Sequence, residues 1–221
     1  METYLITGVG RGIGRALAEE ALARGYKVVG STRDGQCGWS HNRLSVLAFD
    51  VTDQNSVHNA AQNFDGTIDV LVNNAGVFGP RNQNLMDLDP AEMLAVMDVN
   101  IVGPFRVLKA FSPNLAQSTN GRVLVISSGM GRFSGNSVGA SAYRASKAGV
   151  NKLVQTLANE LNAQNISIVA CHPGWVRTDM GGSGAEIDAA ESARGLIDLA
   201  EKLTLAGTGC FMDWAGHRQD W

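Results

Sequence analysis

Cysteine is scarce in this sequence, and the few cysteines present are widely scattered. The 221 residues contain three cysteines, and none of them forms a C-x-x-C pair. An odd, scattered set fits neither a disulfide framework nor a structural zinc site. His41, His58 and His217 show no metal-ligand spacing either. We therefore expect a reducing compartment and no bound metal.

Runs of one charge sign and long apolar stretches are also missing. The formal net charge is -3, and no cluster of Lys and Arg marks a surface for a phosphate backbone. Nucleic acid and anionic membrane are therefore poor default partners. No apolar stretch approaches the ~20 residues of a membrane span, and no basic leader precedes the strand-like run Thr3–Thr7. We expect no membrane partner and a cytoplasmic location.

Glycine, by contrast, is abundant. It accounts for 26 of the 221 residues, against a usual share of ~7%. The glycines cluster at discrete turns and do not form a low-complexity tract. This placement indicates backbone that approaches a ligand closely.

Short apolar runs alternate with amphipathic segments along the chain. The expected strands are Tyr4–Thr7, Lys27–Ser31, Ser45–Phe49, Asp69–Asn73, Arg122–Ser127, Ser167–Cys171 and Gly209–Asp213. Several of them are apolar without interruption. That pattern is typical of strands buried on both faces of a parallel sheet, although buried helices can share it.

Helical spacing of apolar residues marks segments between the strands. The expected helices are Ile13–Arg24, Asn100–Leu115, Tyr143–Leu161 and Ala189–Leu203. Repeated strand–helix alternation predicts an α/β fold: a doubly wound parallel sheet of the Rossmann type, with about seven strands and helices on both faces. We see no linker or internal repeat, so residues 1–221 are expected to form a single dinucleotide-binding catalytic domain.

The first strand leads into a glycine-rich turn and then into a helix. The pattern is T-G-x-x-x-G-x-G, which departs from the G-x-G-x-x-G fingerprint. Pyrophosphate needs bare backbone N–H groups at a helix N-terminus, where side chains would hold it away. We interpret Gly8 as the turn, Gly12 as the opening for the phosphates and Gly14 as the point of close helix–strand packing. The alternative is a glycine-rich turn without a ligand.

The end of the second strand bears on which nucleotide binds. An acidic residue there favours NAD, whereas an arginine accommodates the 2′-phosphate of NADP. Here Ser31 and Thr32 are neutral and Arg33 follows, while Arg11 in the glycine turn could reach the same phosphate. Both arginines could instead be ordinary surface residues, and Asp34 adjoins Arg33. We favour NADP(H).

Tyr143 and Lys147 are four residues apart, so a helix places them on one face. A tyrosine of pKa ~10 is a weak acid–base catalyst near neutrality. A nearby ammonium group favours the phenolate and lowers the pKa of the phenol, which brings proton transfer into range. A lone pair of this kind is more often simply a surface feature.

Other polar residues are expected at the same edge of the sheet. Ser127 and Ser128 end one strand, Asn73–Gly76 ends the preceding one, and Asn100 is expected to begin the helix between them. Strand-end serines and asparagines also cap turns. Doubly wound sheets nevertheless bind their ligands at the carboxyl ends of the strands, so their joint placement predicts an active site.

Together these motifs resemble those of the short-chain dehydrogenase/reductase family. The resemblance extends from Thr7 to Thr178, and the ending Gly209–Trp221 is similar to small carbonyl reductases of the C-factor/Sniffer kind. It implies a catalytic tetrad of Asn100, Ser128, Tyr143 and Lys147. Ser128 is taken in preference to Ser127 because the family uses the second serine of such a pair.

The resemblance also implies a role for each member of the tetrad. Tyr143 donates the proton, Ser128 orients the carbonyl group, and Lys147 lowers the pKa of the phenol and holds the nicotinamide ribose. Asn100 organises a proton-relay water.

With the two arginines included, the expected cofactor contacts are Gly8, Arg11, Gly12, Ile13, Gly14, Arg33, Asp50, Val51, Asn74, Ala75, Gly76, Tyr143, Lys147, Pro173, Gly174, Val176 and Thr178.

The expected activity is that of an NADP(H)-dependent oxidoreductase, which transfers a hydride between nicotinamide and a small-molecule carbonyl or alcohol. Two departures from the family bear on the pocket. An insertion is expected within Ser134–Ser141, and the short segment after Met180 suggests an open site where many relatives carry a lid. The helices that contain Phe105 and Val154 resemble those that pair in family dimers, so a homodimer or homotetramer is possible, as is a monomer.

Two rival functions remain open. The first is an NADP(H)-sensing signalling or scaffold protein with little turnover, against which the intact tetrad argues. The second is a nucleotide-sugar epimerase or dehydratase, which shares the Tyr-x-x-x-Lys pair. Too few residues follow Thr178 for the large substrate region of those enzymes.

The role of several further side chains is also open at this point. Phe78, Met130, Phe133 and Trp175 could line the pocket or belong to the core. Cys171 and His172, at a strand end before a proline, are interpreted as packing residues.

Overall fold

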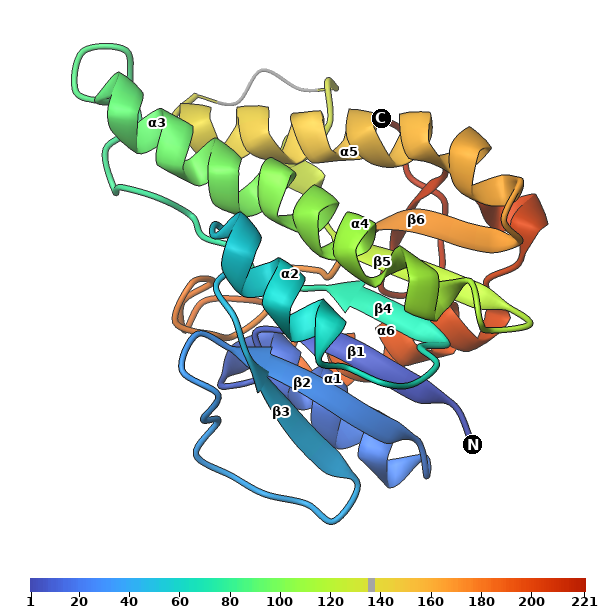
Figure 1. Ribbon diagram of the computed structural model, residues 1–221. Helices are drawn as coiled ribbons and strands as arrows, with labels where there is room; N and C mark the ends of the chain where they lie inside the picture. The colour runs from blue at the N-terminus through green and yellow to red at the C-terminus, as the bar shows by residue number, and fades with distance from the viewer. Residues whose placement is uncertain (135–137) are drawn as a thin grey trace.

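The computed structural model describes residues 1–134 and 138–221, and these form a parallel sheet with helices on both faces (Figure 1). The order of the seven strands in the sheet is β3-β2-β1-β4-β5-β6-β7, and every pairing is parallel. The strands are β1 (Thr3–Thr7), β2 (Lys27–Thr32), β3 (Leu44–Ala48), β4 (Val70–Asn73), β5 (Gly121–Ile126), β6 (Ile166–His172) and β7 (Phe211–Asp213). The predicted doubly wound fold is confirmed.

The described part of the chain contains six α-helices: α1 (Gly12–Ala23), α2 (Gln54–Gln62), α3 (Pro90–Met97), α4 (Gly103–Leu115), α5 (Ser141–Asn162) and α6 (Ala189–Lys202). Helices α1 and α6 lie on one face, and α2, α4 and α5 lie on the other (Figure 1). Each face therefore has its own apolar layer.

Alternation along each strand supplies these two layers. In β1, Tyr4 and Ile6 pack under α1 and α6, whereas Leu5 packs under the opposite helices with Phe111 and Val154. All of these side chains are buried. Because both faces of the strand are covered by helices, it reads as an uninterrupted apolar run.

The seven expected strands are all present, with ends displaced by one or two residues. Two helices were not expected, α2 and α3. Each buries little apolar surface, with Val57 in α2 and Val96 in α3 as the only fully buried side chain. Their signal lies in the caps, because Asp53 and Asp89 each accept hydrogen bonds from the first turn.

The expectation that Asn100 begins a helix is wrong. Helix α3 continues through a π-helical segment, Asp98–Val102, directly into α4, so Asn100 lies within a continuous helical path. Pro104 follows in the first turn of α4. Because proline has no N–H, the main-chain carbonyl of Asn100, four residues earlier, has no α-helical partner.

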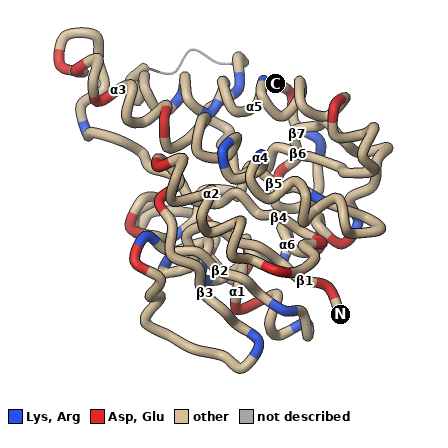
Figure 2. The backbone as a smooth tube through the Cα atoms, viewed as in Figure 1, with Lys and Arg blue, Asp and Glu red and all other residues tan. Residues whose placement is uncertain are grey.

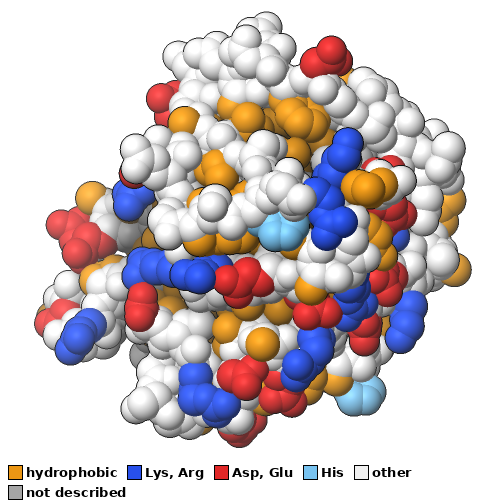
Figure 3. Space-filling view, turned by 90° about the horizontal axis from the view of Figure 1, so that it is seen from below, with side chains coloured by type: hydrophobic (Ala, Val, Ile, Leu, Met, Phe, Trp, Pro, Cys, Tyr) orange, Lys and Arg blue, Asp and Glu red, His pale blue; other side chains and the backbone are white. Residues whose placement is uncertain are grey.

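Charges of both signs are interspersed along the chain (Figure 2). On the face seen in Figure 3, Lys and Arg side chains lie beside Asp and Glu side chains, and no broad region of one sign is visible. No helix in residues 1–134 and 138–221 has the length and apolar character needed to cross a bilayer. The insertion expected within Ser134–Ser141 falls partly outside the described residues.

Strand order reverses between β1 and β4, because the chain moves outward through β2 and β3 before it returns to the centre. In open α/β sheets this reversal opens a crevice at the carboxyl ends of the strands, where ligands bind. The loops after β1, β2, β3, β4, β5 and β6 carry most of the expected site residues, and Asn100, Tyr143 and Lys147 lie on the helical segments that follow β4 and β5. The topology therefore gathers them at one edge.

Candidate active site

Tyr143 lies in the first turn of α5 and is 8% exposed. Its ring packs against that of Phe78, with centroids 4.9 Å apart. Burial raises the pKa of the phenol, because the anion would lose its hydration, and the neighbouring Ser128 hydroxyl opposes that rise. The phenol and the Ser128 hydroxyl, predicted to act together, are therefore neighbours.

Lys147 lies one turn further along α5, and its Nζ atom is 5.7 Å from the centroid of the Tyr143 ring. Nζ donates a hydrogen bond of 2.7 Å to the carbonyl oxygen of Ile126, the last residue of β5. Burial lowers the pKa of the amine to about 8, so Lys147 remains mostly protonated at pH 7. We expected the amine to lower the pKa of the phenol; in the protein alone the largest effect on the phenol is burial, which acts in the opposite direction.

The two serines after β5 have different surroundings. Ser127 Oγ donates to Asn151 Oδ1 at 2.5 Å, and this buried contact ties the strand end to α5. Ser128 Oγ accepts from the Met130 amide at 3.1 Å and faces the phenol. Of the two serines, Ser128 is therefore the one beside the phenol, and Ser127 is held by α5.

Asn100 is 1% exposed, and its side-chain amide forms three hydrogen bonds. Oδ1 accepts from the Val77 amide at 2.9 Å, and Nδ2 donates to the Val77 carbonyl and to Ser146 Oγ. A Cβ atom on Gly76 would lie 3.2 Å from Asn100 Oδ1 and 3.7 Å from Lys147 Nζ. The glycine therefore keeps the space between these two groups open.

The glycine turn fits a dinucleotide pyrophosphate. Helix α1 begins without a side-chain cap and without an acidic residue in its first turn, so its free N–H groups and positive dipole end suit an anion. At Gly14 a Cβ atom would lie only 2.1 Å from the Gly8 carbonyl oxygen, which only glycine permits. Thr178 contacts the position of a Cβ on Gly12, so the loop after β6 borders the same turn.

Thr7, the threonine that opens the glycine motif, joins the turn to the loop after β4. Its hydroxyl accepts from the amides of Asn74 and Ala75, both at 2.9 Å, and Asn74 Nδ2 donates to the Thr7 carbonyl. These bonds fix the expected contacts Asn74, Ala75 and Gly76 beside the glycine turn.

The remaining expected cofactor residues lie at the same edge, with one difference. Arg33 is exposed after β2. The pKa of Asp50 is lowered mainly by hydrogen bonds from Thr52, and the positive charge of Arg33 lowers it further. Arg11 does not join Arg33; it forms a 2.5 Å ion pair with the exposed Asp179. The negative charge of Asp179, on the loop after β6, holds Arg11 toward that side of the crevice.

The loop after β6 carries the last group of expected contacts: Pro173, Gly174, Val176 and Thr178. The Pro173 carbonyl accepts a 2.6 Å hydrogen bond from Ser192 in α6, which anchors the start of this loop. Val176 is buried and bridges to Ile187.

Comparison with known proteins identifies the family. A family profile described as short chain dehydrogenase matches residues 2–187. The chain belongs to the short-chain dehydrogenase family. The C-signal of Myxococcus xanthus is 40% identical over 157 residues, which cover 71% of this chain and 94% of that protein. The 3-oxoacyl-[acyl-carrier-protein] reductase FabG of Escherichia coli is 34% identical over 184 residues, 80% of this chain and 74% of the relative.

Solved structures of carbonyl reductases share the whole fold. The carbonyl reductase Sniffer of D. melanogaster has a TM-score of 0.92 and 28% identity, with full coverage of both chains. An NADPH-bound carbonyl reductase from chicken fatty liver has a TM-score of 0.91 and 27% identity, covering 100% of this chain and 99% of that one. The chain is similar to both over its full described length.

For four residues, the sequence did not decide between a place in the pocket and a place in the core. Phe133 is 82% exposed and Trp175 is 52% exposed, so neither belongs to the core. Phe78 packs on the phenol, and Met130 is half-buried beside Ser128. Cys171 is fully buried, and the His172 ring lies against Gly129, which agrees with the interpretation of both as packing residues.

Proposed function

We propose that this chain is an NADP(H)-dependent carbonyl reductase, with residues 1–221 as one catalytic domain. Its substrate would be a small-molecule carbonyl compound, and Tyr143 would act as general acid. The observation that supports this most directly is the proximity of the Tyr143 phenol to the Ser128 hydroxyl, with the Lys147 amine one helical turn away. That set lies at the sheet edge that carries the glycine turn.

The residues divide the chemistry as follows. A bound nicotinamide supplies the hydride. Ser128 donates a hydrogen bond to the carbonyl oxygen and orients it, and Tyr143 passes its proton to the developing alkoxide. Lys147, charged at pH 7, stabilises the phenolate that remains. We assign the relay role of Asn100 to its main-chain carbonyl, because both N–H donors of its side chain are occupied and Pro104 gives that carbonyl no α-helical partner.

Three features support NADP(H) as the cofactor. The end of β2 carries no acidic residue at Ser31 or Thr32, Arg33 is exposed there, and the N-terminus of α1 is uncapped. Solved relatives include NADPH-bound and NADP-bound proteins as well as a reductase from Brucella melitensis complexed with NADH. The free cysteines agree with a reducing cytoplasm as the location that we propose.

A second candidate function is an NADP(H)-sensing signalling protein with little turnover. Similarity to the C-signal of Myxococcus xanthus favours it. The two candidates differ in one measurable property, because only the reductase consumes NADPH when a carbonyl compound is added.

Tyr143→Phe is the deciding variant. We expect kcat with a panel of aldehydes, ketones and quinones to fall at least ~100-fold, because positioned acid catalysis contributes ~10²–10⁴-fold, while NADPH binding measured by fluorescence is kept. Tyr26→Phe is the matched control, because the Tyr26 hydroxyl bonds Glu201 away from the site. The wild type should prefer NADPH to NADH. Near-normal turnover of Tyr143→Phe would contradict the reductase, and NADPH binding without turnover in the wild type would favour the sensor.

A further inference from the structure

Gln83 is a buried amide in the loop between β4 and α3, and it is 2% exposed. Its Nε2 donates to the carbonyl oxygens of Phe78 and Pro80, both at 2.9 Å. Its Oε1 accepts a 3.0 Å hydrogen bond from the main-chain N–H of Tyr143. Both ends of the amide are therefore used, one within its own loop and one on the catalytic helix.

The N-terminus of α5 has no cap of its own. The residue at the capping position, Ala140, has a side chain without oxygen and a left-handed backbone with φ 54°. A capping side chain normally accepts from the second or third N–H of the helix. Gln83 Oε1 takes the third, that of Tyr143, and the Gln83 main-chain carbonyl takes the first, that of Ser141, at 3.3 Å. A residue 60 positions away therefore caps the helix.

The same amide also controls what faces the phenol. By holding the carbonyl groups of Phe78 and Pro80, Nε2 fixes the loop that presents the Phe78 ring, which packs on the Tyr143 ring. Loss of Gln83 would release the backbone of Tyr143 and the aromatic wall beside it together.

We propose that Gln83 is a positioning residue for the reaction: it acts through Tyr143, setting the phenol against Ser128 and Lys147 and fixing Phe78 as the substrate-side wall. This inference rests on the proposed reductase activity. Catalytic groups must be held within about 0.5 Å of productive geometry, and a misplacement of about 1 Å can cost ~10²-fold in rate. The buried cap is the contact that meets this requirement for the first turn of α5.

Two substitutions separate the two ends of the amide. Gln83→Ala removes both, so kcat for carbonyl reduction should fall ~10- to 100-fold, with the Kd for NADPH within about threefold of the wild type. Gln83→Glu keeps an acceptor for the Tyr143 N–H, but it replaces the amide NH₂ that donates to both the Phe78 and Pro80 carbonyls with an oxygen. The kcat of Gln83→Glu should be at least about fivefold higher than that of Gln83→Ala, and its KM for aromatic carbonyl substrates should be higher than that of the wild type. Asn82→Ala, on the exposed neighbour, is the matched control and should behave as the wild type.

Amide hydrogen exchange tests the cap without turnover. Exchange in residues 141–146 should be at least about tenfold faster in Gln83→Ala than in the wild type, near wild-type in Gln83→Glu, and unchanged in Asn82→Ala. The proposal is overturned if Gln83→Ala keeps kcat within twofold, if it loses NADPH binding in parallel with kcat, or if Gln83→Glu rescues nothing. A wild type without turnover would refute the reductase alone, and unchanged exchange in Gln83→Ala would refute the cap.

Discussion

The amine of Lys147 is held at a cost to the stability of the fold. Burial lowers its pKa from 10.5 to about 8, so at pH 7 the folded protein keeps a charge that water would solvate better. A pKa difference of this size corresponds to roughly 3 kcal/mol of lost folding free energy. The hydrogen bond from Nζ to the Ile126 carbonyl recovers about 1 kcal/mol. A residue that destabilises the fold is expected to be there for function.

Lys147→Met should therefore make the protein more stable and inactive. We expect the free energy of unfolding at pH 7 to rise by about 2 kcal/mol, because methionine fills the same space without a charge, and NADPH-dependent turnover to be lost. Unfolded lysine binds a proton that the folded protein has released above pH 8, so the wild type gains stability as pH rises from 8 toward 10.5. Urea titrations should show the two proteins converging over that range. A variant clearly less stable than the wild type at pH 7 would refute this account.

The placement of some residues could be predicted from the sequence, and that of others could not. The proximity of Tyr143 and Lys147 could, because helical spacing brings them together, and so could the edge at which Ser127 and Ser128 lie, because it follows from a strand end. The choice of Ser128 over Ser127, and the role of each residue, came from the resemblance to the family. Gln83 could not, because its bond to Tyr143 spans 60 positions in a loop with no periodic pattern. Arg11 was assigned to the 2′-phosphate side, yet Asp179, distant in sequence, is its partner in the fold.

At the scale of elements, the helical path from α3 to α4 shows how a local break serves the site. Pro104 prevents an unbroken α-helix, and the π-helical segment Asp98–Val102 turns the Asn100 amide toward Val77 and Ser146. The apolar spacing after Asn100 predicted the helix but not this segment, because side-chain periodicity does not show which carbonyl lacks a partner. The start of the helix was misplaced for the same reason.

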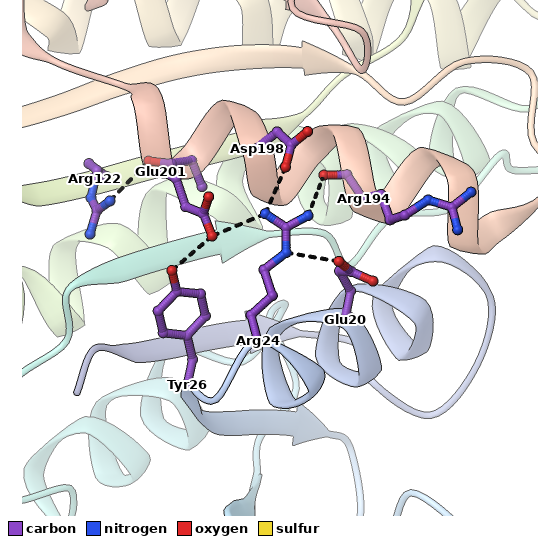
Figure 4. Close-up of polar contacts among 8 residues, drawn as sticks. Glu20, Arg24, Tyr26, Arg122, Arg194, Asp198 and Glu201 are labelled. Carbon is purple, nitrogen blue, oxygen red and sulfur yellow. Dashed lines mark hydrogen bonds and ion pairs between the residues drawn. The ribbon is translucent and has the colours of Figure 1, made fainter.

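An arginine also joins α1 to α6, in addition to their shared apolar layer (Figure 4). Arg24 ends α1 and bonds Glu20 at 2.8 Å, Asp198 at 2.7 Å and Glu201 at 3.0 Å. Its guanidinium also reaches the Arg194 carbonyl on α6. Because the side chain is 24% exposed, water competes only in part for these bonds.

Arg24→Met should lower the free energy of unfolding by about 2 kcal/mol, because it leaves partly buried carboxylates without their shared cation. Arg15→Met is the matched control on the same helix: the Arg15–Glu19 pair is about half exposed, and its loss should change stability by less than about 1 kcal/mol. Urea denaturation measures both. Equal effects of the two variants would show that the α6 contacts add nothing. Turnover should be retained, since Arg24 lies at the opposite end of α1 from the glycine turn.

For the whole molecule, strand–helix alternation was sufficient to predict the sheet, because parallel strands need crossovers and doubly wound sheets bind ligands at one edge. The return of the C-terminal tail to pair with β7 could not be predicted in this way. The tail after β7 turns back and pairs with that strand through Met212 and Arg218, and Gln219 donates its main-chain N–H to the Phe211 carbonyl at 2.7 Å. The sequence of the tail has no periodic pattern that predicts its pairing with β7.

This returning tail also reaches the loop that carries Ser128. Arg132 donates to Gln219 Oε1 at 3.2 Å, and the Phe133 amide donates to the Trp221 carbonyl, also at 3.2 Å. The Trp221 ring stacks on Phe211, with centroids 5.8 Å apart. These contacts join β7, the tail and the loop that carries Ser128. A change in residues 219–221 should therefore alter the position of Ser128.

Removal of residues 219–221 should lower both stability and kcat. Loss of the packed Trp221 ring removes about 2 kcal/mol, which for a chain of this size corresponds to a fall in Tm of roughly 5 °C. Loss of the two bonds to the serine loop should lower kcat about fivefold while the Kd for NADPH stays constant, because the glycine turn lies on β1 and not on the tail. Arg218→Ala keeps the tail and its bonds to Arg132 and Phe133, so it should leave kcat unchanged. If the truncated protein lost stability but kept full kcat at a temperature where it is folded, the tail would serve the fold alone, and Ser128 would owe its position to β5 and α5.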